Sequence, residues 1–288
     1  MNPVGANTWI WQSPLDDATL SPLVAKVSEL GFDSIELPIE ELGAFDPRLA
    51  AELIAAQGLG ASICAAFPPG RDLLADAEVV ASTQAFLRGC IDVAATVGAP
   101  VVGGPMTAAV GRVWRLEPGE RPALLARLAQ ALRPVADYAG EVGVRLALEP
   151  LNRYETSVVN TAEQGLEVLA AVDSPVLGLL LDSYHMNIEE KHPAEAIRLA
   201  GEHLLHVHAS ASDRGAPGAD HLDWPALAEA LREVGYAGTL CIEAFTPLQP
   251  AIATAAYIWR PVAASQDALA GEGLAFLRAL LADFGPPA

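Results

Sequence analysis

The strongest constraint on the fold is an eightfold alternation of short apolar runs with long amphipathic stretches. The apolar runs end near Trp11, Ile39, Ala66, Met106, Leu151, Asp182, Ser210 and Phe245. The stretches between them are rich in Ala, Leu, Glu and Arg, and they are most clearly helical at 20–30, 78–97, 121–142, 161–172, 224–234 and 265–283. Strands buried on both faces of a parallel sheet give such apolar runs. Eight strand–helix units therefore predict an α/β fold, the closed (β/α)8 TIM barrel.

Local signals mark the ends of these predicted helices. Asn160-Thr-Ala-Glu163 and Asp223-Trp-Pro225 are typical helix starts. Glycines that follow the helical stretches supply their ends, at Gly31, Gly58, Gly98, Gly143 and Gly235. A doubly wound sheet is the competing architecture, but it usually has about five or six strands and an early Gly-rich phosphate turn. The barrel is preferred, and its closure would bring Trp9 and Trp11 near Glu243.

Length and charge limit the class of protein. A chain of 288 residues that is 52% hydrophobic can form one large domain, so 1–288 is expected to be a single barrel. Its 17 basic and 36 acidic residues give a net charge of −19. This charge repels phosphate backbones and anionic lipids. We therefore expect a small-molecule substrate, with no nucleic-acid or membrane partner.

Cysteine placement and the N-terminus predict a cytoplasmic protein. Cys64, Cys90 and Cys241 lie in apolar runs without C-x-x-C spacing, which favours neither disulfides nor a zinc knuckle. The N-terminal residues lack a basic segment followed by an apolar one. No run reaches the ~18 apolar residues of a membrane span. We expect a soluble, unprocessed protein.

Four potential metal ligands stand at the ends of predicted strands. They are Glu149, Asp182, His208 and Glu243, separated by 33, 26 and 35 residues. Any one of them alone could be a helix cap or a solvated loop residue. In a barrel, however, the C-terminal strand ends meet at one face, where active sites lie. Three carboxylates and an imidazole converging there predict a divalent metal site.

The second half of the chain resembles the ketose 3-epimerases, which include D-tagatose 3-epimerase and D-psicose (D-allulose) 3-epimerase among the xylose-isomerase-like barrels. The motifs that carry the resemblance are Glu149-Pro-Leu-Asn-Arg-Tyr-Glu-Thr156 with Asn160-Thr161, Leu181-Asp-Ser-Tyr-His-Met-Asn-Ile-Glu-Glu190, His208 with Asp213-Arg-Gly-Ala-Pro-Gly218, and Ile258-Trp-Arg260. The resemblance is strongest over 145–260. Over 1–140 it is limited to the barrel rhythm and fragments such as Gly31-Phe-Asp-Ser-Ile-Glu36.

The resemblance implies a mechanism. The four ligands would bind one divalent ion per subunit, manganese, cobalt or magnesium, and Glu149 and Glu243 would also be the catalytic acid/base pair. Inverting a carbon next to a ketone needs proton removal on one face and return on the other, through a cis-enediolate. Expected substrates are free ketoses: D-fructose/D-psicose, D-tagatose/D-sorbose, and ketopentoses. The acidic balance and the lack of a Gly-rich phosphate cradle favour free sugars over sugar phosphates.

The resemblance also implies substrate contacts. His185, Arg214 and Glu155 match the family's substrate-binding or supporting residues, with a loop histidine, a solvated turn residue and a helix cap as their structural alternatives. Trp114 is the best candidate for an apolar wall against the sugar, among five aromatics near the loop ends: Trp9, Trp11, Phe67, Trp114 and Trp259. His206 could be a fifth ligand, but a hydrogen-bonded position in the barrel interior is preferred.

One departure and several alternatives stand beside this prediction. The family often has Glu three residues after the histidine ligand, where this chain has Ala211; this bears on the preferred sugar rather than on the reaction. The alternatives are an aldose–ketose isomerase of the same superfamily, such as a hydroxypyruvate or sugar isomerase, and a non-catalytic, metal-stabilised sugar-binding barrel. A metal-dependent endonuclease would need more histidines and a basic groove. The resemblance implies a homodimer or homotetramer.

Overall fold

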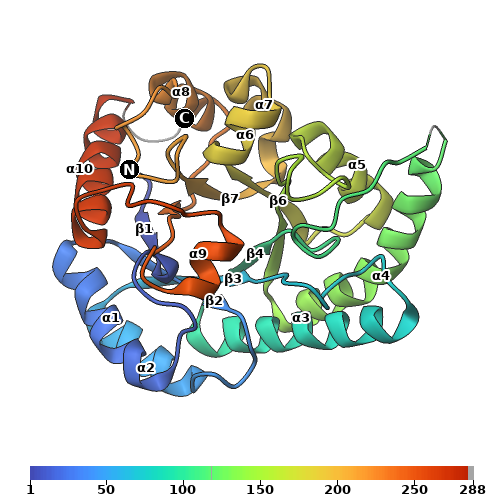
Figure 1. The fold of residues 1–288 in the computed structure, drawn as a ribbon, viewed down its shortest axis with the longest axis horizontal. Helices are drawn as coiled ribbons and strands as arrows, with labels where there is room; N and C mark the ends of the chain where they lie inside the picture. The colour runs from blue at the N-terminus through green and yellow to red at the C-terminus, as the bar shows by residue number, and fades with distance from the viewer. Residues whose placement is uncertain (118, 285–288) are drawn as a thin grey trace.

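A closed barrel of parallel strands forms the centre of the molecule (Figure 1). The computed structural model describes residues 1–117 and 119–284. The strands are β1 (Val4–Asn7), β2 (Ser34–Ile39), β3 (Gly60–Ala65), β4 (Val101–Gly104), β5 (Arg145–Leu148), β6 (Leu177–Asp182), β7 (Leu204–Ala209) and β8 (Leu240–Ile242). Each pairs in parallel with its neighbours, and β8 closes the barrel against β1. The predicted (β/α)8 fold is confirmed.

Helices surround the barrel. The main ones are α1 (Asp17–Leu30), α2 (Pro47–Gln57), α3 (Ala77–Val97), α4 (Arg121–Val142), α5 (Ala162–Val172), α7 (Pro193–Ala200), α8 (Trp224–Glu233) and α10 (Gln266–Phe284). Shorter elements occupy the connections: η1 (Thr8–Ile10), α6 (Ser183–Glu189), η2 (Gly201–His203) and α9 (Pro250–Ala255). Figure 1 shows α9 in front of the strands, within the ring of outer helices. Within the described residues, no helix combines the length and apolar character of a membrane span.

The helix ends follow the predicted capping chemistry. Thr161 and Asp223 are N-caps whose side chains accept from backbone N–H groups of the first turn. The C-caps of α1, α2, α3 and α4 are left-handed glycines, Gly31, Gly58, Gly98 and Gly143. Glycine reaches this conformation without a steric cost from a Cβ. The predicted helices therefore agree with the structure to within three residues at either end.

The first strand ends earlier than predicted. The apolar run was expected to continue to Trp11, but β1 ends at Asn7 and the single turn η1 follows. The Asn7 side chain accepts a hydrogen bond from the Trp9 backbone N–H at 2.9 Å, which starts that turn. Trp11 consequently points to α10, where its Nε1 donates to Asp267. Trp9 lies beside the segment that follows β8, where its carbonyl accepts from Thr246 N and its ring packs on Phe245.

Candidate active site

The four predicted ligands come together at the C-terminal ends of β5 to β8. Glu149 follows β5, Asp182 ends β6, His208 lies in β7 and Glu243 follows β8. One ligand atom from each lies within 4.8 Å of the others, and all four side chains are buried. Adjacent parallel strands end at the same face of a barrel, so ligands far apart in sequence become neighbours. The prediction that these side chains converge is confirmed in position.

Glu149, Asp182, His208 and Glu243 are called the quartet below. Two of its atoms are suited to bind a cation. His208 Nε2 bonds Glu36 Oε1 at 2.8 Å, so Nδ1 is the ring nitrogen that faces the quartet. Nδ1 lies 3.3 Å from Glu243 Oε1 and 3.6 Å from Glu149 Oε1. Within residues 1–117 and 119–284, His208 Nδ1 and Glu149 Oε1 are buried without a hydrogen-bond partner. Buried polar atoms are nearly always paired, so these two fit a bound divalent ion.

Arg214 adds a fixed positive charge beside the quartet. Its Nη1 donates to Asp182 Oδ2 at 2.6 Å and to Glu243 Oε2 at 2.8 Å. The guanidinium also stacks on Tyr184, 3.9 Å from the ring centroid. A tight turn aims this side chain: the backbone of Arg214 is left-handed, with φ 64°, and its N–H donates to the Ala211 carbonyl. Ala211 is therefore part of the turn that positions Arg214, and its side chain is buried.

Burial and neighbouring charges shift the pKa values of the quartet's members in different directions. Burial acts to raise the pKa of Asp182, but Arg214, His185 and His208 together outweigh it and hold that pKa below its ordinary value. Burial raises the pKa of Glu243 to about 8, against the opposing effects of His208 and Arg214. Burial acts to lower the pKa of His208, but the carboxylates of Glu243 and Glu36 raise it well above its ordinary value. The quartet therefore retains protons near neutral pH that a divalent ion would displace.

We expect the metal-free protein to become less stable between about pH 6 and pH 8, by on the order of 2 kcal/mol. The folded-state pKa values of Glu243 and His208 are both raised, so the folded chain binds protons more tightly than the unfolded chain. Stability from this source is complete at low pH and is lost as pH rises toward the folded values. Urea unfolding with a chelator would measure it. A free energy of unfolding that is equal or greater at pH 8 contradicts this expectation, and Glu243→Gln should flatten the curve.

His185 is held as a hydrogen-bond donor toward the cavity. Its Nδ1 accepts from the backbone N–H of Asn152 at 3.0 Å, so the proton of the neutral ring is on Nε2. Nε2 lies 3.2 Å from Arg214 Nη2, which is also a donor and cannot accept that proton. Nε2–H is therefore available for an oxygen in the cavity. Asn152 also donates from Nδ2 to Glu155 Oε1 at 2.8 Å, which fixes Glu155 at the same edge.

A cavity of about 590 Å³ opens over the quartet. Glu149, Glu243, His185, Arg214 and Glu155 all line it, together with the aromatic rings of Trp9, Phe67 and Phe245 and one face of α9. Trp9 and Phe245 pack together, with ring centroids 5.5 Å apart. A mostly apolar pocket with a few convergent polar groups is the usual form of a small-molecule site.

The structure does not bring Trp114 to this cavity. The segment after β4 reaches it with Val110 and Gly111, whose backbone N–H groups bond the Phe67 and Glu155 carbonyls. The chain then turns outward, and Trp114 N donates to Ser157 while its ring lies against Arg112. Trp114 is absent from the described residues that line the cavity. Trp259 is also outside it and is 69% exposed.

Comparison with known proteins identifies the family of this chain. The model of the xylose isomerase-like TIM barrel family matches residues 24–280. The chain is 35% identical to a probable ketose 3-epimerase from Synechocystis and 34% identical to a ketose 3-epimerase from Arthrobacter globiformis, over 95% or more of each chain. The chain belongs to the ketose 3-epimerase family. The crystal structure of a Methylomonas D-allulose 3-epimerase in complex with D-allulose matches with a TM-score of 0.90 at 30% identity over 96% of each chain.

The family predicted from the sequence, an isomerase-class family of epimerases, is confirmed. One residue of the site, Glu36, was not predicted. Glu36, in the middle of β2, contacts both His206 and His208 at 2.8 Å inside the barrel. The preferred interior position of His206 is confirmed. The available signal was a carboxylate within the apolar run Ser34-Ile-Glu-Leu-Pro-Ile39, because an ionised side chain there must have a buried partner.

Proposed function

We propose that this protein inverts C3 of free ketoses, using Glu149 and Glu243 as the acid/base pair and one divalent ion per subunit. The observation that carries the proposal is that these two carboxylates, from β5 and β8, both border the cavity and both belong to the quartet. Epimerisation needs a base on one face of the substrate and an acid on the other. Two carboxylates that share a cavity from different strands can supply both.

The chain's own residues account for the proton transfers. In one direction, one glutamate removes the C3 proton and the other returns a proton to the opposite face of the cis-enediolate. The reverse reaction exchanges their roles. His185 Nε2–H and the Arg214 guanidinium border the cavity as donors for substrate oxygens. Trp9, Phe67 and Phe245 exclude water from the apolar side, which strengthens these interactions.

The quartet would hold the ion through one oxygen of each of Glu149, Asp182 and Glu243 and through His208 Nδ1. When bound there, a divalent ion supplies Lewis-acid polarisation of a ketone and a fixed template for adjacent oxygens. A donor set of three carboxylates and one imidazole suits manganese, cobalt or magnesium. The identity of the ion, like the homodimeric or homotetrameric state and the cytoplasmic location, stays a prediction from the sequence.

Charge around the cavity favours a neutral sugar over a sugar phosphate. Five glutamates line it, Glu40, Glu41, Glu149, Glu155 and Glu243, against one arginine among the described lining residues. This acidic excess disfavours a phosphate dianion. The Methylomonas relative's structure contains D-allulose, a free ketohexose. We therefore propose D-fructose/D-allulose and D-tagatose/D-sorbose as the substrate pairs.

The function is tested by incubating the protein with D-fructose and Mn²⁺ in deuterated water and following the sugars by NMR. The expected result is D-allulose with deuterium at C3. An aldose product with deuterium at C1 or C2 would instead identify an aldose–ketose isomerase. Absence of exchange with a panel of ketohexoses and ketopentoses would refute catalysis on free ketoses and favour the sugar-binding alternative.

A further inference from the structure

We propose that Glu36 is the positioning residue of the metal centre: its carboxylate holds His208 so that Nδ1, and not Nε2, faces the quartet. This inference rests on the proposed metal site. Glu36 lies outside the four proposed ligands and does not line the cavity, so any effect on the reaction would pass through His208.

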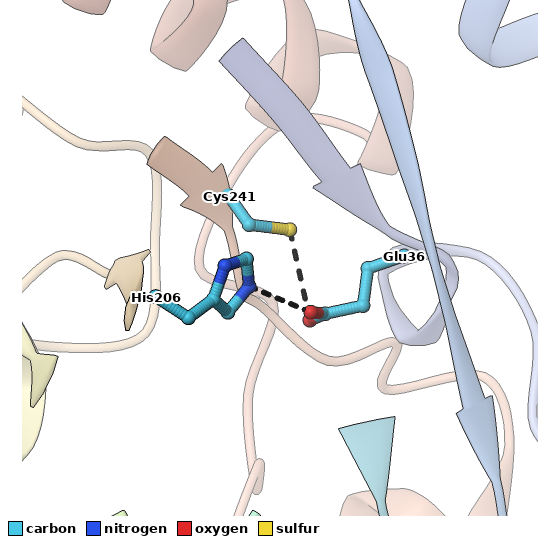
Figure 2. A group of neighbouring side chains, drawn as sticks. All are labelled: Glu36, His206 and Cys241. Atoms are coloured by element: carbon cyan, nitrogen blue, oxygen red, sulfur yellow. Dashed lines mark hydrogen bonds and ion pairs between the residues drawn. The ribbon is translucent and has the colours of Figure 1, made fainter. Parts of the chain in front are cut away.

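The first argument is the number of donors that meet on one buried carboxylate. Glu36 has no solvent exposure. Its Oε1 accepts from Asn7 Nδ2 at 2.9 Å and from His208 Nε2 at 2.8 Å, and its Oε2 accepts from Ser62 Oγ at 2.9 Å and from His206 Nε2 at 2.8 Å. The Cys241 thiol lies 3.6 Å from Oε1 (Figure 2). These contacts come from strands β1, β3, β7 and β8, so the barrel itself fixes this carboxylate on β2.

The second argument is which atom of each pair carries the proton. An ionised carboxylate only accepts hydrogen bonds, so the Nε2 atoms of His206 and His208 must both be donors to Glu36. A histidine ligates a metal through an unprotonated nitrogen, and the partner of its other nitrogen selects which one. With Nε2–H of His208 bound to Glu36, Nδ1 is the nitrogen available to the quartet, and it has no hydrogen-bond partner among the described residues.

Glutamine at position 36 cannot reproduce this arrangement. Its amide has one oxygen that accepts and one NH₂ group that donates. In either orientation one of the two histidines faces a donor. If that histidine is His208, its Nε2 becomes the acceptor and its proton moves to Nδ1, where it opposes metal binding. If it is His206, His208 keeps a neutral amide oxygen in place of a carboxylate, which makes its Nδ1 a weaker ligand.

The Glu36, His206 and Cys241 side chains could themselves be mistaken for a metal site, since their ligand atoms also lie within 4.8 Å of one another. Both Glu36 oxygens already accept two hydrogen bonds from nitrogen or hydroxyl donors, however. A metal ion bound to Glu36 would have to break hydrogen bonds that these oxygens already accept. The quartet above it instead contains two buried atoms, Glu149 Oε1 and His208 Nδ1, that lack hydrogen-bond partners among the described residues.

The test compares Mn²⁺ affinity, without sugar, in the wild type, Glu36→Gln and Ser62→Ala. Ser62 contacts Glu36 Oε2 only, so Ser62→Ala perturbs the carboxylate without removing its bond to His208. Glu36→Gln is expected to weaken Mn²⁺ binding by about 10- to 100-fold and Ser62→Ala by less than about threefold. Equal affinity of the wild type and Glu36→Gln overturns the proposal, and so does an equal loss in the two variants. Metal-free circular dichroism and unfolding midpoints establish that the variants fold.

A second measurement does not depend on any variant. The wild type is labelled with ¹⁵N-histidine and loaded with ¹¹³Cd²⁺ alone. The proposal predicts ¹¹³Cd–¹⁵N coupling at Nδ1 of His208, with the proton retained on Nε2. Coupling through Nε2 of His208, or a thiolate-shifted ¹¹³Cd resonance coupled to His206, overturns it. Because no sugar is present, failure of this inference leaves the epimerase assay intact, and failure of that assay leaves these metal measurements interpretable.

Discussion

Glu243→Gln is expected to lower kcat for epimerisation by about 10²- to 10⁴-fold, because a general acid/base group typically contributes that much. The amide cannot remove or return a proton at C3, although its carbonyl oxygen can still occupy a ligand position. The rate should therefore stay low at saturating Mn²⁺, when the metal content of the variant equals that of the wild type. The measurement is D-fructose conversion under initial-rate conditions, together with elemental analysis of the protein.

Glu229→Gln is the matched control for this variant. Glu229 is an exposed residue of α8, so the same chemical change there should leave kcat unaltered.

Glu149→Gln should also lose epimerisation, since both carboxylates are needed for inversion. The two variants can differ in which epimer still exchanges its C3 proton with deuterated water, which would identify the face that each glutamate serves. Retention of more than a tenth of the wild-type kcat in metal-loaded Glu243→Gln would falsify its assignment to the acid/base pair.

Removal of divalent ions is expected to reduce epimerisation by about 10²- to 10³-fold, since Lewis-acid polarisation contributes several kcal/mol to such reactions. Without the ion, three buried carboxylates lie close together, and Glu149 Oε1 and His208 Nδ1 have no hydrogen-bond partner among the described residues. Metal removal should therefore also lower the midpoint of thermal unfolding. Adding an ion at about 100 times its Kd should restore about 2.7 kcal/mol of stability. Activity and unfolding are measured on dialysed protein before and after titration with Mn²⁺, Co²⁺ or Mg²⁺.

A chelator already saturated with the same ion is the control for side effects of the chelator, and it should change neither quantity. Asp182→Asn offers an independent check, because Asp182 is a ligand candidate outside the proposed acid/base pair. This variant should require more metal for half-maximal activity. Full activity in protein that elemental analysis finds free of transition metals and magnesium would contradict metal dependence.

The sequence alone was sufficient to predict the barrel and to predict that the four proposed ligands lie close together. The strand and helix periods differ, so eight alternations could be counted, and capping residues such as Thr161 and Gly143 marked helix ends locally. The quartet was predictable because parallel strands of one barrel end at one face. Glu149 and Glu243 could thus be placed together although 94 residues separate them.

Only the tertiary structure decided which side chains meet around that quartet. Nothing local indicated that Glu36 would accept from His208, or that Arg214 would lie between Asp182 and Glu243. The direction of Trp114 was likewise set by hydrogen bonds to distant loops. Periodicity and capping depend on neighbours within a few residues, whereas the partner of a buried charge is whichever residue barrel closure brings within hydrogen-bonding distance. The sequence determined the barrel and the face at which its polar strand-end residues meet, and packing across the barrel determined the contacts of each functional group.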